Sequence, residues 1–241
     1  MSRNHCLNNL LINFSMQFCS TFPLRSSFAT RLTWATNLLL CVFSLLASTV
    51  GTASAQPANL FGFHELQRES LEIFPQWTSV LKRHARDNLI DSDCGKSSLR
   101  CHMAEWQQFL GSIKGQSARQ QFTAVNSFAN EKKYVLDIDI YGVPDYWAIP
   151  REFLYNNGDC EDFAILKYMS LRQLGFSVDM MRVVVLQDTN LRTAHAVLAL
   201  YTDNDILILD NQTQQIVSHR NIVHYVPIFS VNEKHWWMHT P

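Results

Sequence analysis

The chain has 241 residues, of which 47% are hydrophobic, so it holds enough apolar material for one compact domain of ordinary size. Its 20 lysine and arginine residues nearly balance its 21 aspartate and glutamate residues. This balance supplies neither the basic field that attracts nucleic acid nor the acidic excess of a solvating tail. Charge therefore argues against a nucleic-acid partner and indicates no other.

The first 55 residues have the composition of an export signal. They contain three arginines and no acidic residue, followed by the apolar run Leu38 to Val50 and then by Ala53-Ser54-Ala55. The run of thirteen residues is shorter than the about 20 residues that span a bilayer. The sequence predicts a signal peptide over residues 1–55 and one mature domain over residues 56–241. An uncleaved N-terminal anchor, or a start of translation at Met16, are the alternatives.

Export would leave three cysteines in the mature chain, namely Cys94, Cys101 and Cys160. Cys94 and Cys101 lie close together in a polar stretch, and an oxidising compartment permits a short-loop disulfide between them. That pairing would leave Cys160 unpaired. The alternative is that Cys94 and Cys101 are two unpaired surface thiols.

Helical patterns dominate the chain before residue 141. Apolar periodicity predicts helices over residues 64–90 (divided at Pro75), 104–113 and 117–130. Ser117 is the expected N-cap of the last of these helices. Apolar and acidic residues then alternate from Leu136 to Ile140, which indicates a short strand, and residues 141–150 are predicted to form a loop.

The pattern sharpens after Asn156. A turn over residues 156–159 precedes a helix predicted from Cys160 to Leu174, which Gly175 terminates and which carries few polar residues after its first turn. Strands are predicted over residues 178–187, 193–201 and 205–210, the last two joined by a tight turn at Asp203-Asn204. The pattern predicts an α+β fold in which a buried helix packs on an antiparallel sheet.

Three residues of this second half form a candidate catalytic triad. Cys160 begins a helix, where unpaired N–H groups and aligned peptide dipoles favour a thiolate. With a two-residue turn at Asp203-Asn204, residues whose numbers sum to 407 face each other, so Asp210 opposes Val197 and is a diagonal neighbour of His195. Such diagonals lie about 7 to 8 Å apart at the backbone, within reach of an imidazole and a carboxylate.

The sequence therefore predicts Cys160 as nucleophile, His195 as general base and Asp210 as the residue that orients the histidine. Each has an ordinary structural alternative: a small core residue, a core histidine and a turn aspartate. The remaining histidines of the mature chain are predicted to lie on the surface, and they are His64, His84, His102, His219, His224, His235 and His239.

Three acidic residues flank the candidate nucleophile, and they are Asp159, Glu161 and Asp162. Without neutralisation these carboxylates would raise the pKa of the thiol. A hard cation such as Ca²⁺, which binds several carboxylate oxygens in flexible geometry, resolves this conflict. Helix capping, with Asp159 as N-cap and Asp162 completing a capping box, is an equally good interpretation of the spacing.

These motifs together resemble a known family. The matching stretches are Asp145-Tyr146-Trp147, the block from Gly158 to Ile165 (Gly-Asp-Cys-Glu-Asp-Phe-Ala-Ile), His195-Ala196-Val197-Leu198 and Leu209-Asp210-Asn211. They resemble the bacterial transglutaminase-like cysteine proteinases, the family of the LapG-type periplasmic proteases. The resemblance covers essentially the whole mature chain, and it departs at Asn156-Asn157, where small residues are expected.

The resemblance implies a papain-like fold, a Cys160, His195, Asp210 triad and Ca²⁺ held by Asp159, Glu161 and Asp162. Proteases of this type cut the N-terminal region of large cell-surface adhesins beside paired alanines. An inner-membrane receptor that senses cyclic di-GMP restrains them. The resemblance thus implies a periplasmic endopeptidase that regulates biofilm attachment, with an adhesin as substrate and no attachment to the membrane after signal cleavage.

Two other functions use the same residues. A protein-glutamine acyltransferase or amidase would employ the same triad with a different second substrate, and a non-catalytic binding module would employ only the calcium site.

The inner-membrane receptor would need a docking region on the protease. An exposed apolar surface around Trp147 or Trp236-Trp237 is the expected region.

Overall fold

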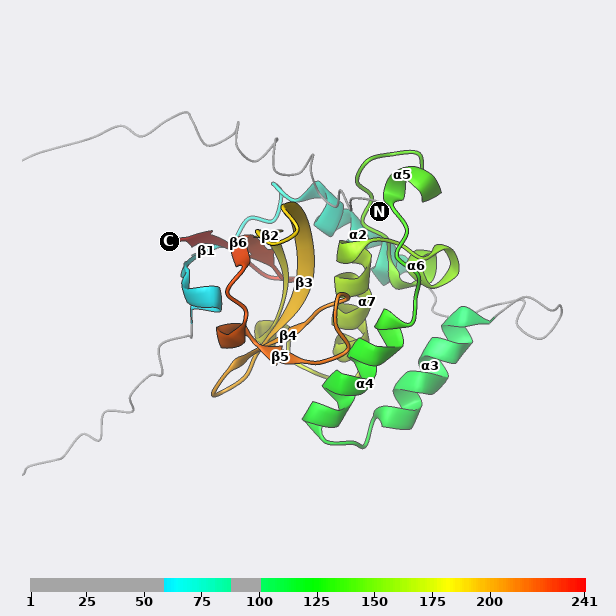
Figure 1. Ribbon diagram of the computed structural model, residues 1–241. Coiled ribbons are helices and arrows are strands. Elements are labelled where there is room, and N and C mark those ends of the chain that lie inside the picture. Colours follow the sequence, from blue (N-terminus) through cyan, green and yellow to red (C-terminus); the bar gives the residue numbers. More distant parts are fainter. Residues whose placement is uncertain (1–58, 88–100) are drawn as a thin grey trace, which may run out of the picture.

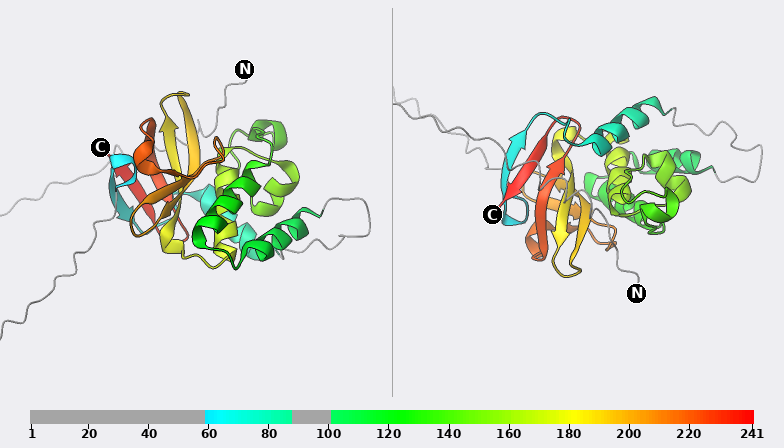
Figure 2. Two further views of the ribbon diagram at one scale, coloured as in Figure 1. Left: turned by 60° about the horizontal axis from the view of Figure 1, so that its bottom comes forward. Right: turned by 90° about the horizontal axis from the view of Figure 1, so that it is seen from above.

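The computed structural model describes residues 59–87 and 101–241, which form an α+β fold with its helices gathered on one side of a twisted sheet (Figures 1 and 2). The predicted fold class is therefore confirmed. The predicted signal peptide and Cys94 lie outside the described residues, so both stay predictions. Within the described ranges, no helix is long and apolar enough to cross a membrane.

The helical layer is built around one central helix, α7. The α-helices of the described residues are α2 (Pro75–Arg86), α3 (His102–Ile113), α4 (Ala118–Asn130), α5 (Asp137–Ile140), α6 (Pro150–Asn156) and α7 (Cys160–Gln173). Every residue of α7 from Cys160 to Leu171 is buried, and Gly175 follows with φ +96°, a backbone conformation that favours glycine. Both the extent and the burial predicted for this helix are confirmed.

The sheet has seven strands in the order β1-β7-β6-β2-β3-β4-β5, and all neighbouring strands run antiparallel. The strands are β1 (His64–Arg68), β2 (Met181–Asp188), β3 (Thr193–Tyr201), β4 (Ile206–Leu209), β5 (Val217–Ser218), β6 (Tyr225–Val231) and β7 (Trp236–Thr240). Three 3₁₀ turns complete the element list: η1 (Leu60–Gly62), η2 (Val178–Met180) and η3 (His219–Asn221). In the β3–β4 hairpin Leu198 pairs with Leu209 and Tyr201 pairs with Ile206, which is the predicted register.

Helix α7 lies between the sheet and the outer helices, as Figure 1 shows. Its outer side is fixed to α3 by a hydrogen bond from Nε1 of Trp106 to Oγ of Ser170, at 2.9 Å. From α2, the Trp77 ring packs edge-on against Tyr168 at 5.3 Å between centroids. The Trp77 indole N–H also donates to the carbonyl oxygen of Asn232 at 2.8 Å, beyond the end of β6. These contacts fix the second half of α7 between the outer helices and the sheet.

Two predicted elements are wrong. Residues 64–68 form strand β1 instead of a helix, because they pair with β7 at the far end of the chain, and the helix begins only at Pro75. Residues 137–140 form the short helix α5 instead of a strand. In α5 the alternation is inverted, because the carboxylate of Asp137 is buried and Ile138 is 53% exposed. A backbone N–H of Tyr146 donates to that carboxylate and so stabilises its inward orientation.

Several histidines and tryptophans that were expected on the surface are buried instead. His219 and His239 are buried, since Nδ1 of His219 accepts from the Phe61 N–H at 3.0 Å and Nε2 of His239 lies 2.9 Å from Oγ of Ser230. The tryptophans expected to form an exposed docking surface are buried as well, and they are Trp147, Trp236 and Trp237.

A lysine lies in the interior of this packing. Lys167 belongs to α7, it is fully buried, and its Nζ has no hydrogen-bond partner among the described residues. Burial lowers the pKa of this amine to about 7, against the opposing attraction of the Asp210 carboxylate. The unfolded chain therefore binds more protons than the folded chain between about pH 7 and pH 10.5, so this group destabilises the fold most below pH 7.

Replacement Lys167→Met keeps the length of the side chain and removes the buried amine. We expect the midpoint of thermal unfolding to rise by about 3 °C or more at pH 6 and by less at pH 10. Thermal scans at both pH values measure this difference. Lys234→Met is the control, because Lys234 pairs with Asp179 at an exposed position. A fall in the midpoint at pH 6 would show that the amine stabilises the fold.

Candidate active site

The first turn of α7 places Cys160 at a helix N-terminus, as predicted. Asp159 is the N-cap in extended conformation, and its backbone N–H donates to Oδ2 of Asp162 at 3.3 Å, which is one half of a capping box. Asn157 precedes it with φ +66° and reverses the chain between α6 and α7. The capping interpretation of these acidic residues is therefore correct, and it leaves open what else they do.

His195 and Asp210 form a buried pair. Nε2 of His195 lies 2.9 Å from Oδ1 of Asp210, and both side chains are at least nine-tenths buried. Oδ1 also accepts from the Gln212 N–H at 2.9 Å, and Oδ2 accepts from the Tyr225 hydroxyl at 2.6 Å. Burial raises the pKa of Asp210, but the attraction of His195 and these hydrogen bonds outweigh it and lower the pKa to about 2. The carboxylate is thus ionised at neutral pH.

Helix α7 packs directly on β3, the strand that carries His195. The two neighbours of this histidine, Ala194 and Ala196, belong to the same core as α7, so the alternation of the strand places the His195 side chain on the other face of the sheet, beside Tyr225. The structure therefore joins His195 to Asp210 by a direct contact and places Cys160 at one end of the helix that packs on their sheet.

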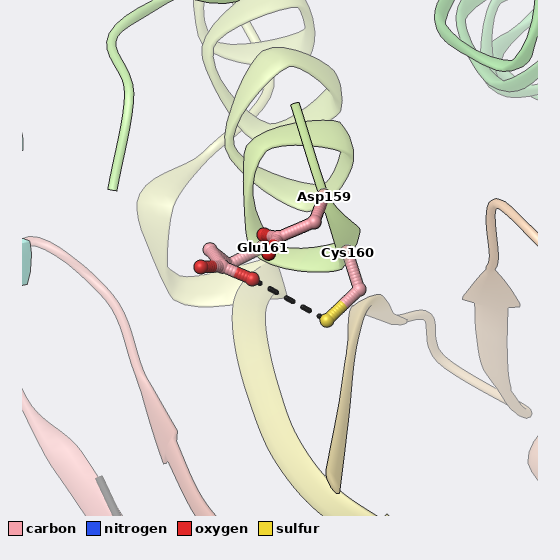
Figure 3. Close-up of side chains that lie close together, drawn as sticks. All are labelled: Asp159, Cys160 and Glu161. Atoms are coloured by element: carbon pink, nitrogen blue, oxygen red, sulfur yellow. Dashed lines mark hydrogen bonds between the residues drawn. The ribbon is translucent and has the colours of Figure 1, made fainter. Parts of the chain in front are cut away.

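The sulfur of Cys160 lies at the start of α7, in a fully buried residue, 3.3 Å from Oε2 of Glu161 (Figure 3). The expectation that Cys160 is unpaired is wrong for this structure, because Cys101 and Cys160 are both disulfide-bonded. A disulfide sulfur carries no ionisable proton, so the contact with Glu161 becomes a hydrogen bond only when Cys160 is reduced. A nucleophilic role for Cys160 likewise requires the reduced thiol. The predicted Cys94–Cys101 pairing stays a prediction, because Cys94 lies outside the described residues.

Five carboxylates gather beside Cys160. The three predicted from sequence are joined by two others, so that the cluster consists of Asp137, Asp145, Asp159, Glu161 and Asp162. Ligand oxygens within 4.8 Å of one another are found for Asp137, Asp145 and Glu161, and again for Asp137, Asp159 and Asp162. Asp162 is held by the Ala148 N–H at 2.7 Å, and Asp145 by Nε2 of Gln76 from α2 at 3.1 Å.

The cluster carries more negative charge than the protein neutralises. Burial raises the pKa of Asp137 to about 7, with the charge of Asp159 adding to the effect. Burial also raises the pKa of Asp159, and it places the pKa values of Glu161 and Asp162 well above their ordinary range, with Asp159 the next largest cause for both. Buried like charges at this spacing either bind protons or require a cation.

Three oxygens of the cluster are suited to a cation. Oδ1 of Asp137, Oδ1 of Asp145 and Oδ1 of Asp159 are buried and have no hydrogen-bond partner among the described residues. Unpaired buried carboxylate oxygens within 4.8 Å of further carboxylates match the oxygen-only ligand set of Ca²⁺. The residues present therefore fit a calcium ion.

Sequence reasoning missed Asp137 and Asp145. Residues 136–140 were interpreted as a strand and Asp137 received no role, whereas α5 buries its carboxylate. The available signal was the concentration of acidic residues in the segment just before the nucleophile, at Asp137, Asp139 and Asp145.

Comparison with known proteins decides the family. The family model of the bacterial transglutaminase-like cysteine proteinases matches residues 91–240. The chain belongs to this family. It is also similar to the solved structure of Legionella pneumophila LapG, with 30% identity and a TM-score of 0.53 over 67% of this chain and 86% of that one. The predictions of a transglutaminase-like fold and of a cysteine proteinase are thus confirmed.

Two further LapG structures from Legionella pneumophila match equally well. One is described as calcium-bound, with 31% identity over 67% of this chain and 86% of that one, and a TM-score of 0.53. The other is described as EGTA-treated, with 30% identity over 67% and 84%, and a TM-score of 0.53. No curated protein matches the chain.

Gly158 sets the spacing between the chain reversal and the acidic cluster of this proteinase. A Cβ at this position would lie 2.0 Å from Oδ2 of Asp162. Gly158→Ala must therefore displace Asp162 from its hydrogen bonds to Asp159 and Ala148. We expect a loss of about 1 to 3 kcal/mol in the free energy of unfolding, measured by urea denaturation, and at least tenfold weaker calcium binding, measured by calorimetry.

The control for this variant is Gly111→Ala in α3, where a Cβ meets nothing within 4 Å. That substitution should leave calcium binding unchanged. Wild-type stability and affinity in the Gly158→Ala protein would show that Asp162 moves without cost and contributes nothing to the cluster.

Proposed function

We propose that this proteinase is a calcium-dependent cysteine endopeptidase in which Cys160 is the nucleophile, His195 the general base and Asp210 the residue that orients it. The observation that carries the proposal is the buried His195–Asp210 pair at 2.9 Å on the sheet against which the helix of Cys160 packs. A histidine that only filled the core would not need an ionised, fully hydrogen-bonded carboxylate beside it.

The hydrogen bonds assign the role of each ring nitrogen. The ionised Asp210 can only accept, so Nε2 of His195 carries the proton of that bond and Nδ1 is left to exchange a proton with the reduced Cys160 thiol. The thiolate attacks the substrate carbonyl carbon, and backbone N–H groups at the start of α7 stabilise the oxyanion. The Nδ1 proton then passes to the leaving amine as the C–N bond breaks.

The second half of the reaction releases the acyl group. Neutral His195 takes a proton from water through Nδ1, and the resulting hydroxide attacks the thioester carbonyl. The C–S bond breaks, the carboxylic acid product leaves, and the thiolate and imidazolium are restored. No electrons are exchanged in either half, so reduction of the disulfide at Cys160 precedes the cycle and is not part of it.

The acidic cluster supplies the calcium dependence in this proposal. Asp159, Glu161 and Asp162, with Asp137 and Asp145, would hold the ion, which neutralises the carboxylates that otherwise raise the pKa of the Cys160 thiol. Asp162 contributes mainly to the rigidity of the site, because both its oxygens accept backbone hydrogen bonds. The structures of LapG described as calcium-bound and EGTA-treated support a calcium site in this family.

For the substrate and the location, we propose the N-terminal region of a large cell-surface adhesin, cut in the periplasm after signal cleavage at Ala55. An inner-membrane receptor that senses cyclic di-GMP would restrain the enzyme and so regulate biofilm attachment. The family resemblance and the sequence of residues 1–55 support this assignment.

The decisive test uses the chain from Gln56 onward, reduced beforehand, with an adhesin N-terminal fragment that contains paired alanines. We expect cleavage in Ca²⁺ and a rate of cleavage at least a hundredfold lower in excess EGTA. Electrophoresis and mass spectrometry of the products measure the cleavage. Cys160→Ala should abolish cleavage and keep the thermal stability of the reduced parent protein. Turnover by Cys160→Ala would exclude the nucleophile, whereas incorporation of a fluorescent amine instead of hydrolysis would identify an acyltransferase.

Calcium binding should depend on pH, because protons and Ca²⁺ compete for carboxylates whose pKa values are raised to about 7 in the case of Asp137. Saturating Ca²⁺ should raise the midpoint of thermal unfolding by several degrees at pH 7.5 and by less at pH 5.5. Scans at both pH values, with Mg²⁺ as control ion, measure the effect. An equal shift at both pH values would place the ion outside this cluster.

A further inference from the structure

We propose that Tyr225 is a positioning residue of the catalytic apparatus, one that holds Asp210 through its hydroxyl and limits the movement of His195 through its ring. The inference rests on the proposed triad and adds a fourth member to it. Sequence reasoning gave Tyr225 no role, and the mechanism above does not use it.

Tyr225 contacts both partners of the His195–Asp210 pair. Its hydroxyl donates to Oδ2 of Asp210 at 2.6 Å, while Oδ1 of the same carboxylate faces His195. Its ring lies edge-on to the imidazole, with 5.8 Å between the ring centroids. A carboxylate held at one oxygen can rotate about its terminal bond, whereas one held at both oxygens keeps a single orientation toward the histidine.

The hydroxyl is a permanent donor in this position. Burial raises the pKa of Tyr225 above its ordinary range, and the neighbouring Asp210 charge raises it further. Tyr225 therefore keeps its proton throughout the working range of the enzyme. Its hydrogen bond is in turn among the interactions that keep the pKa of Asp210 low despite burial.

Tyr225 is itself held from two directions. It begins β6 and pairs with Asp188 of β2, which fixes its backbone. From the other side the ring of Phe61 packs edge-on against it at 5.7 Å. Phe61 has φ +52°, and its N–H donates to the buried His219 ring. The first turn of the described chain, η1, thus supports the triad from the side opposite to α7.

This arrangement predicts what loss of the hydroxyl does. Tyr225→Phe keeps the ring and its contacts with His195 and Phe61 but leaves Oδ2 of Asp210 without its donor. The pKa of Asp210 should rise, since a hydrogen bond to the charged form is lost. Once protonated, Asp210 no longer stabilises the imidazolium, so the thiolate–imidazolium pair should collapse at a higher pH than in the parent protein.

The experiment measures this pair without any peptide substrate. The rate at which iodoacetamide alkylates Cys160 is followed against pH by peptide mass spectrometry, on the reduced chain from Gln56 onward in Ca²⁺. We expect Tyr225→Phe to move the acid limb of this profile upward by about half a pH unit or more and to lower kcat/KM for the adhesin fragment about tenfold.

Tyr201→Phe is the matched control, because the Tyr201 hydroxyl also donates to a buried carboxylate at 2.6 Å, that of Glu65, at the other end of β3. Tyr201→Phe should change neither the acid limb of the alkylation profile nor kcat/KM for the adhesin fragment. Phe61→Ala is the second arm, since it removes the support of the Tyr225 ring and leaves the hydroxyl in place. It should shift the acid limb in the same direction by a smaller amount.

The outcomes separate this inference from the proposed function. A parental acid limb in a folded Tyr225→Phe protein would overturn the role of Tyr225. A shifted limb in a protein that fails to cut the adhesin would support that role and refute only the substrate. If Cys160 of the parent reacts as an ordinary thiol at every pH, the triad itself fails, and the inference fails with it.

Discussion

The structure depends on the burial of negative charge at the start of α7. Asp159, Glu161 and Asp162 lie in the turn that also carries Cys160, and α5 and the following loop add Asp137 and Asp145. Carboxylates this close and this deeply buried destabilise a metal-free protein unless they are protonated. A cation at this point would stabilise the fold and favour the thiolate by the same interaction, so the proposed calcium ion would control both the stability and the activity of one site.

On the sheet, the pKa of a buried carboxylate is lowered instead of raised. Asp210 is buried too, yet its pKa is lowered, because His195, Tyr225 and the Gln212 N–H all stabilise its charge. The acidic residues around Cys160 accept fewer hydrogen bonds for each carboxylate than Asp210 does, and they also repel one another. A cation would therefore be favoured beside Cys160 and not beside Asp210.

Much of this site could be predicted from local sequence, because two of its parts are set by short-range rules. A helix N-terminus follows from the turn at Gly158, and the diagonal placement of His195 and Asp210 follows from one tight turn and the alternation of strands. Residues 64–68 were predicted to be helical and their strand was missed, because its partner, β7, comes at the other end of the chain. Tyr225 was missed for a similar reason, since its contact with Asp210 depends on the register between β2 and β6.

Non-local contacts also connect η1, the first turn of the described residues, to the His195–Asp210 pair. Leu60 is fully buried, in the small core on the face of the sheet that contains Tyr225, and Phe61 packs on that tyrosine. The first turn of the described residues is therefore part of the folded domain, and it reaches the proposed triad through the Phe61 side chain. Because α7 carries the proposed nucleophile and this turn packs beside the proposed acid–base pair from the other face of the sheet, the orientation of the proposed triad depends on two segments about 100 residues apart in the sequence.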